Sequence, residues 1–279
     1  MKLHFIILIS LALTVSCGGG RTAKKETGKA ESKTEAPAEQ QGRPQIKQYG
    51  YKVVKTYPHD TGSYIQGLFW HDGYFYEGTG QYGESRLMKV ELQTGKAVQT
   101  VELPRGYFGE GITWHNGKIY QITWTEGRAF VYDGKTLKQE KIFTYRGPGW
   151  GITSDGKKLY MSDGTEKIYV RDPETFAIEK IITVTIGRNR QHDINELEWI
   201  DGEIWANIYL SKDNRVVRID PGTGYVTGII NFEGIQDEKD RLTNPDHVFN
   251  GIAYDPQTGN IYVTGKYWNK IYQVEITEK

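Results

Sequence analysis

From residue 61 onward, apolar and polar residues alternate in short runs rich in Tyr, Ile, Val and Thr, and turn dipeptides such as Asp-Gly and Asn-Gly separate the runs. No stretch keeps a helical spacing of apolar positions over three turns. Alternation with a period of two residues is typical of β-strands that bury one face. The pattern therefore predicts an all-β chain.

The same pattern of strand, turn and strand recurs five times along the chain. The repeats contain "IQGLFW", "GEGITW", "GWGITS", "INELEW" and "FNGIAY", and equivalent positions are 44, 40, 45 and 55 residues apart. One four-stranded propeller blade needs about 40–50 residues. The spacing predicts a five-bladed β-propeller over 47–279, in which a strand at 51–57 completes the last blade and closes the ring.

Most of the repeated residues are expected to form turns and packing contacts. Glycines follow Asp72, Asn116 and Asp201 at positions that suit tight hairpins. An aromatic residue occupies one position of every repeat, and a recurring residue type indicates packing between blades rather than a ligand site. These aromatic residues are Tyr76, Tyr120, Tyr160, Trp205 and Tyr262.

One equivalent position of the five repeats carries a different kind of residue in most copies, although the residues around it are similar. This first ring consists of Gln66, Glu110, Trp150, Asn195 and Asn250, and a second ring follows fourteen to sixteen residues later, at Gly80, Trp124, Gly164, Tyr209 and Lys266. Neighbouring antiparallel strands bring both rings to the same end of a blade. We therefore expect a pocket with aromatic walls and a few polar groups, as is typical of a small-ligand site.

The first 46 residues have a different composition. An apolar run at 5–15 precedes Cys17, the single cysteine of the chain. This pattern predicts a lipoprotein signal peptide at 1–16 and lipidation of Cys17, with an ordinary secreted chain as the alternative. Residues 17–46 are polar and predict a flexible tether. We expect an exported protein that Cys17 anchors to a membrane, in the periplasm or on the cell surface.

Charge and cysteine content limit the expected partners. The 35 acidic and 35 basic residues give no net charge and form no basic stripe, so nucleic acid is not expected to bind. Without a cysteine after Cys17, no disulfide is expected in the folded domain. A closed propeller has no long exposed strand edge, which favours a monomer.

Motifs in every repeat resemble those of the plant- and bacterial-type glutaminyl cyclases, also called glutamine cyclotransferases. They occur in order over about residues 50–276 and read "YPHDTGSYIQGLFW", "FGEGITW", "YQITW", "GWGIT", "MSDGT", "INELEWIDGEIWAN", "RIDPGTG", "NGIAYD" and "VTGKYW". The resemblance implies a five-bladed propeller that converts the N-terminal glutamine of peptides or proteins into pyroglutamate and releases ammonia. It implies no cofactor and no catalytic metal.

The resemblance also implies the site residues. Glu110 is the expected acid and base, Lys266 the second catalytic residue, and the expected substrate-binding residues are Gln66, Trp124, Trp150, Asn195 and Tyr209. Asn250 is added from its place in the first ring, where its amide can hydrogen-bond the substrate. Tyr209 stands where the family usually has tryptophan, and Pro148 departs from the family pattern in "GPGWG". Tyr209 keeps an aromatic wall but adds a hydroxyl, so substrate preference is expected to differ.

The proposed reaction fits a single carboxylate. Glu110 can take a proton from the attacking amine and give it to the leaving nitrogen, and such transfer contributes about 10²–10⁴-fold. An apolar site raises the pKa of Glu110 and a nearby ammonium lowers it. Lys266 is open to a second interpretation, stabilisation of the oxyanion.

Other interpretations use the same residues. Gln66, Glu110, Asn195 and Asn250 are also compatible with the calcium site of a propeller hydrolase, and the aromatic walls suit a non-catalytic lipoprotein that binds a peptide or glycan. Catalysis by Ser, His and Asp is not favoured, because the histidines stand in turn-like contexts that predict solvent exposure. These histidines are His59, His71, His115, His192 and His247.

Overall fold

The computed structural model describes residues 45–240 and 245–279. These ranges consist of β-strands and connecting turns, with one 3-10 helix, η1 (Glu238–Asp240), and no α-helix. Within them no helix has the length and apolarity to cross a membrane. The predicted all-β class is confirmed, whereas the predicted signal peptide, Cys17 and residues 18–44 of the tether lie outside the described ranges.

Three four-stranded antiparallel sheets follow one another along the chain. The first consists of β2 (Ile65–His71), β3 (Tyr74–Thr79), β4 (Arg86–Glu91) and β5 (Ala97–Glu102). The second consists of β6 (Gly109–His115), β7 (Lys118–Thr123), β8 (Arg128–Asp133) and β9 (Gln139–Thr144). The third consists of β10 (Ile152–Ser154), β11 (Leu159–Ser162), β12 (Lys167–Arg171) and β13 (Ile178–Thr183).

The remaining long strands form an eight-stranded sheet in the order β16-β17-β18-β19-β1-β22-β21-β20. Its strands are β1 (Lys47–Pro58), β16 (Ile194–Ile200), β17 (Glu203–Ile208), β18 (Arg215–Ile219), β19 (Val226–Asn231), β20 (Phe249–Asp255), β21 (Asn260–Gly265) and β22 (Lys270–Glu278). β1 pairs antiparallel with β22 from Tyr49 to Pro58 and parallel with β19. The prediction that 51–57 completes the last repeat is confirmed. A short hairpin, β14 (Thr185–Ile186) with β15 (Asn189–Arg190), lies outside these sheets.

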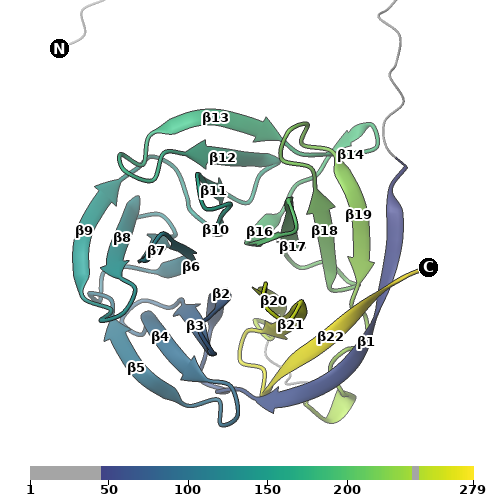
Figure 1. Ribbon diagram of the computed structural model, residues 1–279, viewed down its shortest axis with the longest axis horizontal. Helices are drawn as coiled ribbons and strands as arrows, with labels where there is room; N and C mark the ends of the chain where they lie inside the picture. Colours follow the sequence, from purple (N-terminus) through teal and green to yellow (C-terminus); the bar gives the residue numbers. More distant parts are fainter. Residues whose placement is uncertain (1–44, 241–244) are drawn as a thin grey trace, which may run out of the picture. The chain divides into compact units, whose positions relative to one another are not determined.

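The sheets surround a common centre, with β2, β6, β10, β16 and β20 innermost (Figure 1). Each innermost strand contacts the next one, and β20 contacts β2. The purple β1 and the yellow β22, the first and last strands of the described ranges, lie side by side (Figure 1). The innermost strands therefore form a closed circle.

A glycine follows the varied position in four of the five repeats, and Glu196 stands there in the fourth. At Gly67 and Gly111 the glycine allows neighbouring inner strands to approach closely. A Cβ atom on Gly67 would lie 2.4 Å from the backbone nitrogen of Ile112, and one on Gly111 would lie 2.7 Å from that of Ile152. Backbone atoms cannot move away as a flexible side chain can. Packing therefore requires glycine at these two positions, which explains why the glycine is kept there while the preceding residue varies.

The Asp-Gly and Asn-Gly dipeptides form two-residue hairpin turns. Both residues of Asp72-Gly73, Asn116-Gly117 and Asp201-Gly202 have positive φ, between 46° and 87°. This conformation suits the right-handed twist of the flanking strands, and Asn, Asp and Gly adopt it most readily. The predicted hairpins are confirmed at these three positions.

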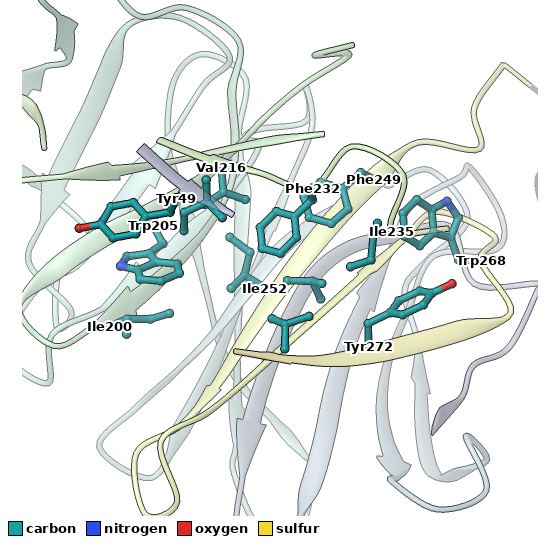
Figure 2. Packing of buried hydrophobic residues seen from close by; sticks show 13 residues of the cluster. Tyr49, Ile200, Trp205, Val216, Phe232, Ile235, Phe249, Ile252, Trp268 and Tyr272 are labelled. Atoms are coloured by element: carbon teal, nitrogen blue, oxygen red, sulfur yellow. The ribbon is translucent and has the colours of Figure 1, made fainter. Parts of the chain in front are cut away.

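The recurring aromatic residues pack between neighbouring strand groups. Tyr76, Tyr120, Tyr160, Trp205 and Tyr262 are all buried, each in a different hydrophobic cluster. Figure 2 shows the cluster in which Trp205 of β17 lies with Ile252 of β20 and Phe249. The prediction that these residues serve packing is confirmed.

Candidate active site

A cavity of about 270 Å³ lies where the inner strands begin and the second strands end. It is lined by Tyr64, Gln66, Gln81, Phe108, Glu110, Trp124, Trp150, Asn195, Tyr209 and Lys266. Four residues of the first predicted ring and three of the second therefore meet in one cavity. Asn250 is not among the lining residues.

Irregular strand pairing accompanies four residues of the first ring. The register between the first and second strands shifts at Ile65/Gly67, Gly109/Ile112, Ile194/Leu197 and Phe249/Ile252. Each shift contains the varied position of its repeat. A β-bulge bends the strand and re-aims a side chain, and bulges are frequent beside active sites. Gln66, Glu110 and Asn195 line the cavity from such positions, whereas Asn250 does not, and Trp150 lines the cavity just before β10 without a register shift.

Glycines of the second ring make room for aromatic rings of the neighbouring segments. A Cβ atom on Gly80 would lie 2.4 Å from the Phe108 ring, and one on Gly164 would lie 2.7 Å from the Trp150 indole. The second ring therefore contributes space at two positions and the side chains of Trp124, Tyr209 and Lys266 at the others.

Two aromatic walls face each other. On one side, the Phe108 ring makes edge contacts with Tyr64 at 6.0 Å and with Trp124 at 5.7 Å between centroids. On the other side, Trp150 and Tyr209 make an edge contact at 5.5 Å. Trp124 is 40% exposed and so stands at the mouth. The walls leave an apolar space that is open at one end.

Glu110 is the single acidic residue among those lining the cavity, and it is 4% exposed. Its Oε1 accepts a hydrogen bond of 3.0 Å from Nε2 of Gln66. Burial raises the pKa of Glu110 well above its usual value, while the Lys266 ammonium lowers it and Glu126 raises it. A carboxyl with a raised pKa is a stronger base than an exposed one and can take up and return a proton.

Lys266 closes the space between the two walls. Its Nζ lies 4.4 Å from the Tyr64 ring centroid and 5.1 Å from that of Tyr209, and the residue is 2% exposed. Burial lowers the pKa of Lys266 to about 8, although Glu110 and Asp246 act in the opposite direction. Aromatic faces favour the ammonium form. Lys266 therefore presents a partly dehydrated cation beside Glu110.

Asn250 supports the cavity from behind. It is 0% exposed, its Oδ1 accepts a hydrogen bond of 3.0 Å from Asn195, and its Nδ2 donates to the Ile65 carbonyl. The structure thus differs from the expectation that Asn250 faces the substrate. Both polar atoms of its amide are used in fixing Asn195 and the start of β2, so Asn195 alone of this pair lines the cavity.

Tyr64, Gln81 and Phe108 also line the cavity and were missed by comparing the two rings. Tyr64 and Phe108 each stand two residues before a varied position, Gln66 and Glu110. An aromatic residue at the same offset in two repeats was the available signal.

The exposure expected for the histidines is wrong at two positions. His59 is 7% exposed and His115 is 5% exposed. Both imidazole groups hydrogen-bond to residues distant in sequence, that of His59 to the Trp268 carbonyl and that of His115 to Ser154. A turn-like sequence context does not reveal such contacts.

One carboxyl group and one ammonium group in an aromatic cavity define an acid–base site for a small substrate group. Among the described residues, no group of three or more His, Cys, Asp or Glu side chains is arranged to hold a metal ion. The fold and the site thus define an all-β protein with an acid–base pocket at the centre of its sheets.

Three comparisons with known proteins point to the same family. A family model described as glutamine cyclotransferase matches residues 26–276. A glutaminyl-peptide cyclotransferase of Arabidopsis thaliana is 36% identical over 234 residues, which cover 81% of this chain and 71% of the relative. The crystal structure of Myxococcus xanthus glutaminyl cyclase matches with a TM-score of 0.80 and 33% identity, over 84% of this chain and 100% of that chain. The chain belongs to the glutamine cyclotransferase family.

Proposed function

We propose that this protein is a glutaminyl-peptide cyclotransferase, which converts the N-terminal glutamine of a peptide or protein into pyroglutamate. The α-amine attacks the side-chain amide carbon, the bond from that carbon to the amide nitrogen breaks, and ammonia leaves. The observation that carries the proposal is the buried Glu110 carboxyl beside Lys266 in an aromatic cavity. The family membership supports it.

The cavity suits a glutamine side chain that is folded back on itself. Holding the amine against the amide carbon makes the reaction effectively unimolecular, which removes much of its entropic cost. Trp124 and Trp150 enclose the two methylene groups and keep water away from the amide. Asn195 and the buried Oε1 of Gln66, which has no hydrogen-bond partner among the described residues, are available to the polar groups of the substrate.

Glu110 carries the proton in this mechanism. It accepts one proton from the attacking amine and donates it to the departing nitrogen, so the carboxyl is restored at the end of each turnover. A raised pKa makes the carboxylate a stronger base for the first step. Lys266 stabilises the negative charge that develops on the amide oxygen. No cofactor takes part in these steps.

We infer further that the fold is a five-bladed β-propeller over residues 47–279. The eight-stranded sheet divides at the parallel pair β1–β19 into two antiparallel groups of four strands. Together with the three four-stranded sheets, these groups match the five sequence repeats.

Mass spectrometry of a peptide that begins with glutamine tests the proposed activity. Incubation with the protein is expected to release one ammonia per peptide, with or without EDTA. A peptide with an acetylated N-terminus is the matched control, since it has no free amine to attack. No ammonia loss from the free peptide would favour a binding protein, and loss that EDTA abolishes would favour a metal-dependent enzyme.

We also propose that the protein is exported, acts as a monomer, and is anchored to a membrane through a lipid on Cys17, in the periplasm or at the cell surface. The apolar run at 5–15 before the single cysteine supports this proposal. Replacing Cys17 by Ser is expected to move the protein from the membrane fraction to the soluble fraction. Retention in the membrane fraction would contradict lipid anchoring.

A further inference from the structure

A buried cluster of polar side chains includes Ser63, the residue directly before the cavity-lining Tyr64. His59 follows β1, Glu77 lies on β3, and their side chains are 0% and 1% exposed. Nε2 of His59 is 3.4 Å from Oε2 of Glu77, and Ser63 donates a hydrogen bond of 2.9 Å to the same oxygen. The mechanism above gives none of these groups a task, and burying them together needs an explanation.

The contacts of His59 favour a charged imidazolium. Its Nδ1 lies 2.7 Å from the carbonyl oxygen of Trp268, which can only accept a hydrogen bond, and its Nε2 faces the Glu77 carboxylate. With a proton on both ring nitrogens, His59 donates to the carbonyl and to the carboxylate. Burial, the largest influence, lowers the pKa of His59, but the Glu77 carboxylate, the Trp268 carbonyl and Asp60 outweigh it, and the pKa is raised. His59 and Glu77 therefore form a buried ion pair.

Ser63 is not a nucleophile in this cluster. Its hydroxyl donates to Glu77 rather than to His59, and the residue is 0% exposed. A hydrolytic triad requires the serine to bond to the histidine and to face the substrate. The geometry instead indicates a structural task for all three side chains.

The cluster joins two segments that are far apart in the sequence. The backbone N–H of His59 donates to the Asn269 carbonyl at 3.1 Å, and that of Tyr267 donates to the Ser63 carbonyl at 2.8 Å. With the bond from His59 to Trp268, residues 59–63 are fixed against the turn at 266–269.

Each of these segments delivers a side chain to the cavity. Tyr64 directly follows Ser63, and Lys266 begins the turn. Nζ of Lys266 lies 4.4 Å from the Tyr64 ring, and the Tyr64 and Tyr267 rings touch at 5.2 Å between centroids. The position of the Lys266 ammonium beside Glu110 therefore depends on how the two segments are held.

We propose that His59 and Glu77 are positioning residues, whose buried ion pair holds the turn that carries Lys266 against the segment that carries Tyr64. The proposal rests on the cyclase activity proposed above. Neither residue touches the substrate, and both act through Lys266. Loosening the turn would admit water to Lys266, and hydration returns a lysine toward its usual pKa. The charged groups that face Lys266 are Glu110 and Asp246, and those that face His59 are Glu77 and Asp60.

The test compares His59→Asn and Glu77→Gln with the wild type. Both variants are expected to lower kcat at least tenfold with a smaller change in KM, and to move the alkaline limb of the kcat/KM profile upward from about pH 8, the pKa of Lys266. A purely structural loss of folded protein would lower the amount of active enzyme without moving that limb. If His59→Asn does not fold, Glu77→Gln, which keeps the side-chain volume, decides the question.

His115→Asn is the matched control. His115 is also buried, but it bonds to Ser154 at 2.7 Å and burial lowers its pKa, so this variant is expected to keep the wild-type profile. Side-chain ¹⁵N NMR supplies a readout that does not depend on activity. At pH 6.5, His59 is expected to give imidazolium signals in the wild type and neutral signals in Glu77→Gln.

The outcomes separate the two proposals. An active wild type together with an unchanged kcat and alkaline limb in both variants, or a neutral His59 in the wild type, would overturn the positioning role and leave the cyclase activity standing. A wild type without cyclase activity would overturn the proposed function, and the positioning role with it.

Discussion

The side-chain amide of Gln66 spans from the substrate cavity to the buried acid, donating from Nε2 to Oε1 of Glu110 at 3.0 Å. The two residues occupy equivalent positions of neighbouring repeats, and a register shift re-aims each of them. Oε1 of Gln66 is buried and has no hydrogen-bond partner in the part of the chain that the structure describes. One amide group can therefore stabilise the Glu110 carboxylate and accept a hydrogen bond from the attacking amine at the same time.

Replacing Gln66 by Leu removes both interactions at similar volume. A hydrogen bond to a charged group contributes about 1.5–3 kcal/mol, so kcat/KM is expected to fall about 10- to 100-fold. Losing a donor to the carboxylate raises the pKa of Glu110, so the acid limb of the profile should move to higher pH. Gln99→Leu on the outer strand β5 is the control, and equal acid limbs in the two variants would contradict the role of Gln66.

Lys266 should determine the alkaline limb of activity. Its pKa in the folded protein is about 8, so the ammonium is lost as the pH rises through that value. Lys266→Met is expected to lower kcat about 10²–10³-fold, as the loss of an oxyanion donor does. Lys266→Arg keeps a cation above pH 8 and should move the alkaline limb upward. An unchanged limb near pH 8 in Lys266→Arg would assign that ionisation to another group.

Glu198 is expected to make stability depend on pH. It is 8% exposed, its side chain accepts a hydrogen bond from the Tyr254 N–H at 3.0 Å, and burial raises its pKa to about 8. Because the folded state keeps a proton that the unfolded chain releases near pH 4.3, the contribution of Glu198 to stability is fully present below that value. It declines by up to about 1.4 kcal/mol per pH unit until about pH 8. Urea unfolding of Glu198→Gln between pH 5 and 8 should show a weaker pH dependence than the wild type, and identical slopes would contradict this.

Packing at the inner strands can be tested with two glycines. Gly67→Ala places a Cβ atom 2.4 Å from the Ile112 backbone nitrogen, whereas Gly106→Ala meets nothing within 4 Å. Overpacking of this kind typically costs about 1–3 kcal/mol. The denaturation midpoint should fall in Gly67→Ala. In Gly106→Ala the free energy of unfolding should stay within about 0.5 kcal/mol of that of the wild type. Equal midpoints would show that the inner strands can move apart without cost.

Much of the fold could be predicted because it rests on local rules. Alternating apolar residues predict strands, positive φ selects glycine in turns, and close approach of inner strands selects Gly67 and Gly111. These requirements recur in several repeats, so they are visible as a pattern. The varied position was recognisable because packing leaves it free.

The remaining features depend on contacts between distant segments. Asn250 occupies a varied position, yet its amide turns toward Asn195 and the Ile65 carbonyl. His59 stands in a turn-like stretch, but its partners Glu77 and Trp268 come from other parts of the chain. Neither arrangement has a periodic signal, and only folding brings the partners together.

The most direct measurement of the central claim is kcat/KM of Glu110→Gln for a peptide that begins with glutamine. The amide has nearly the same shape as the carboxyl but cannot transfer a proton. A folded variant with kcat lowered about 10²–10⁴-fold and KM little changed is the predicted result. Activity within threefold of the wild type would contradict the account, because the proton would then pass through another group.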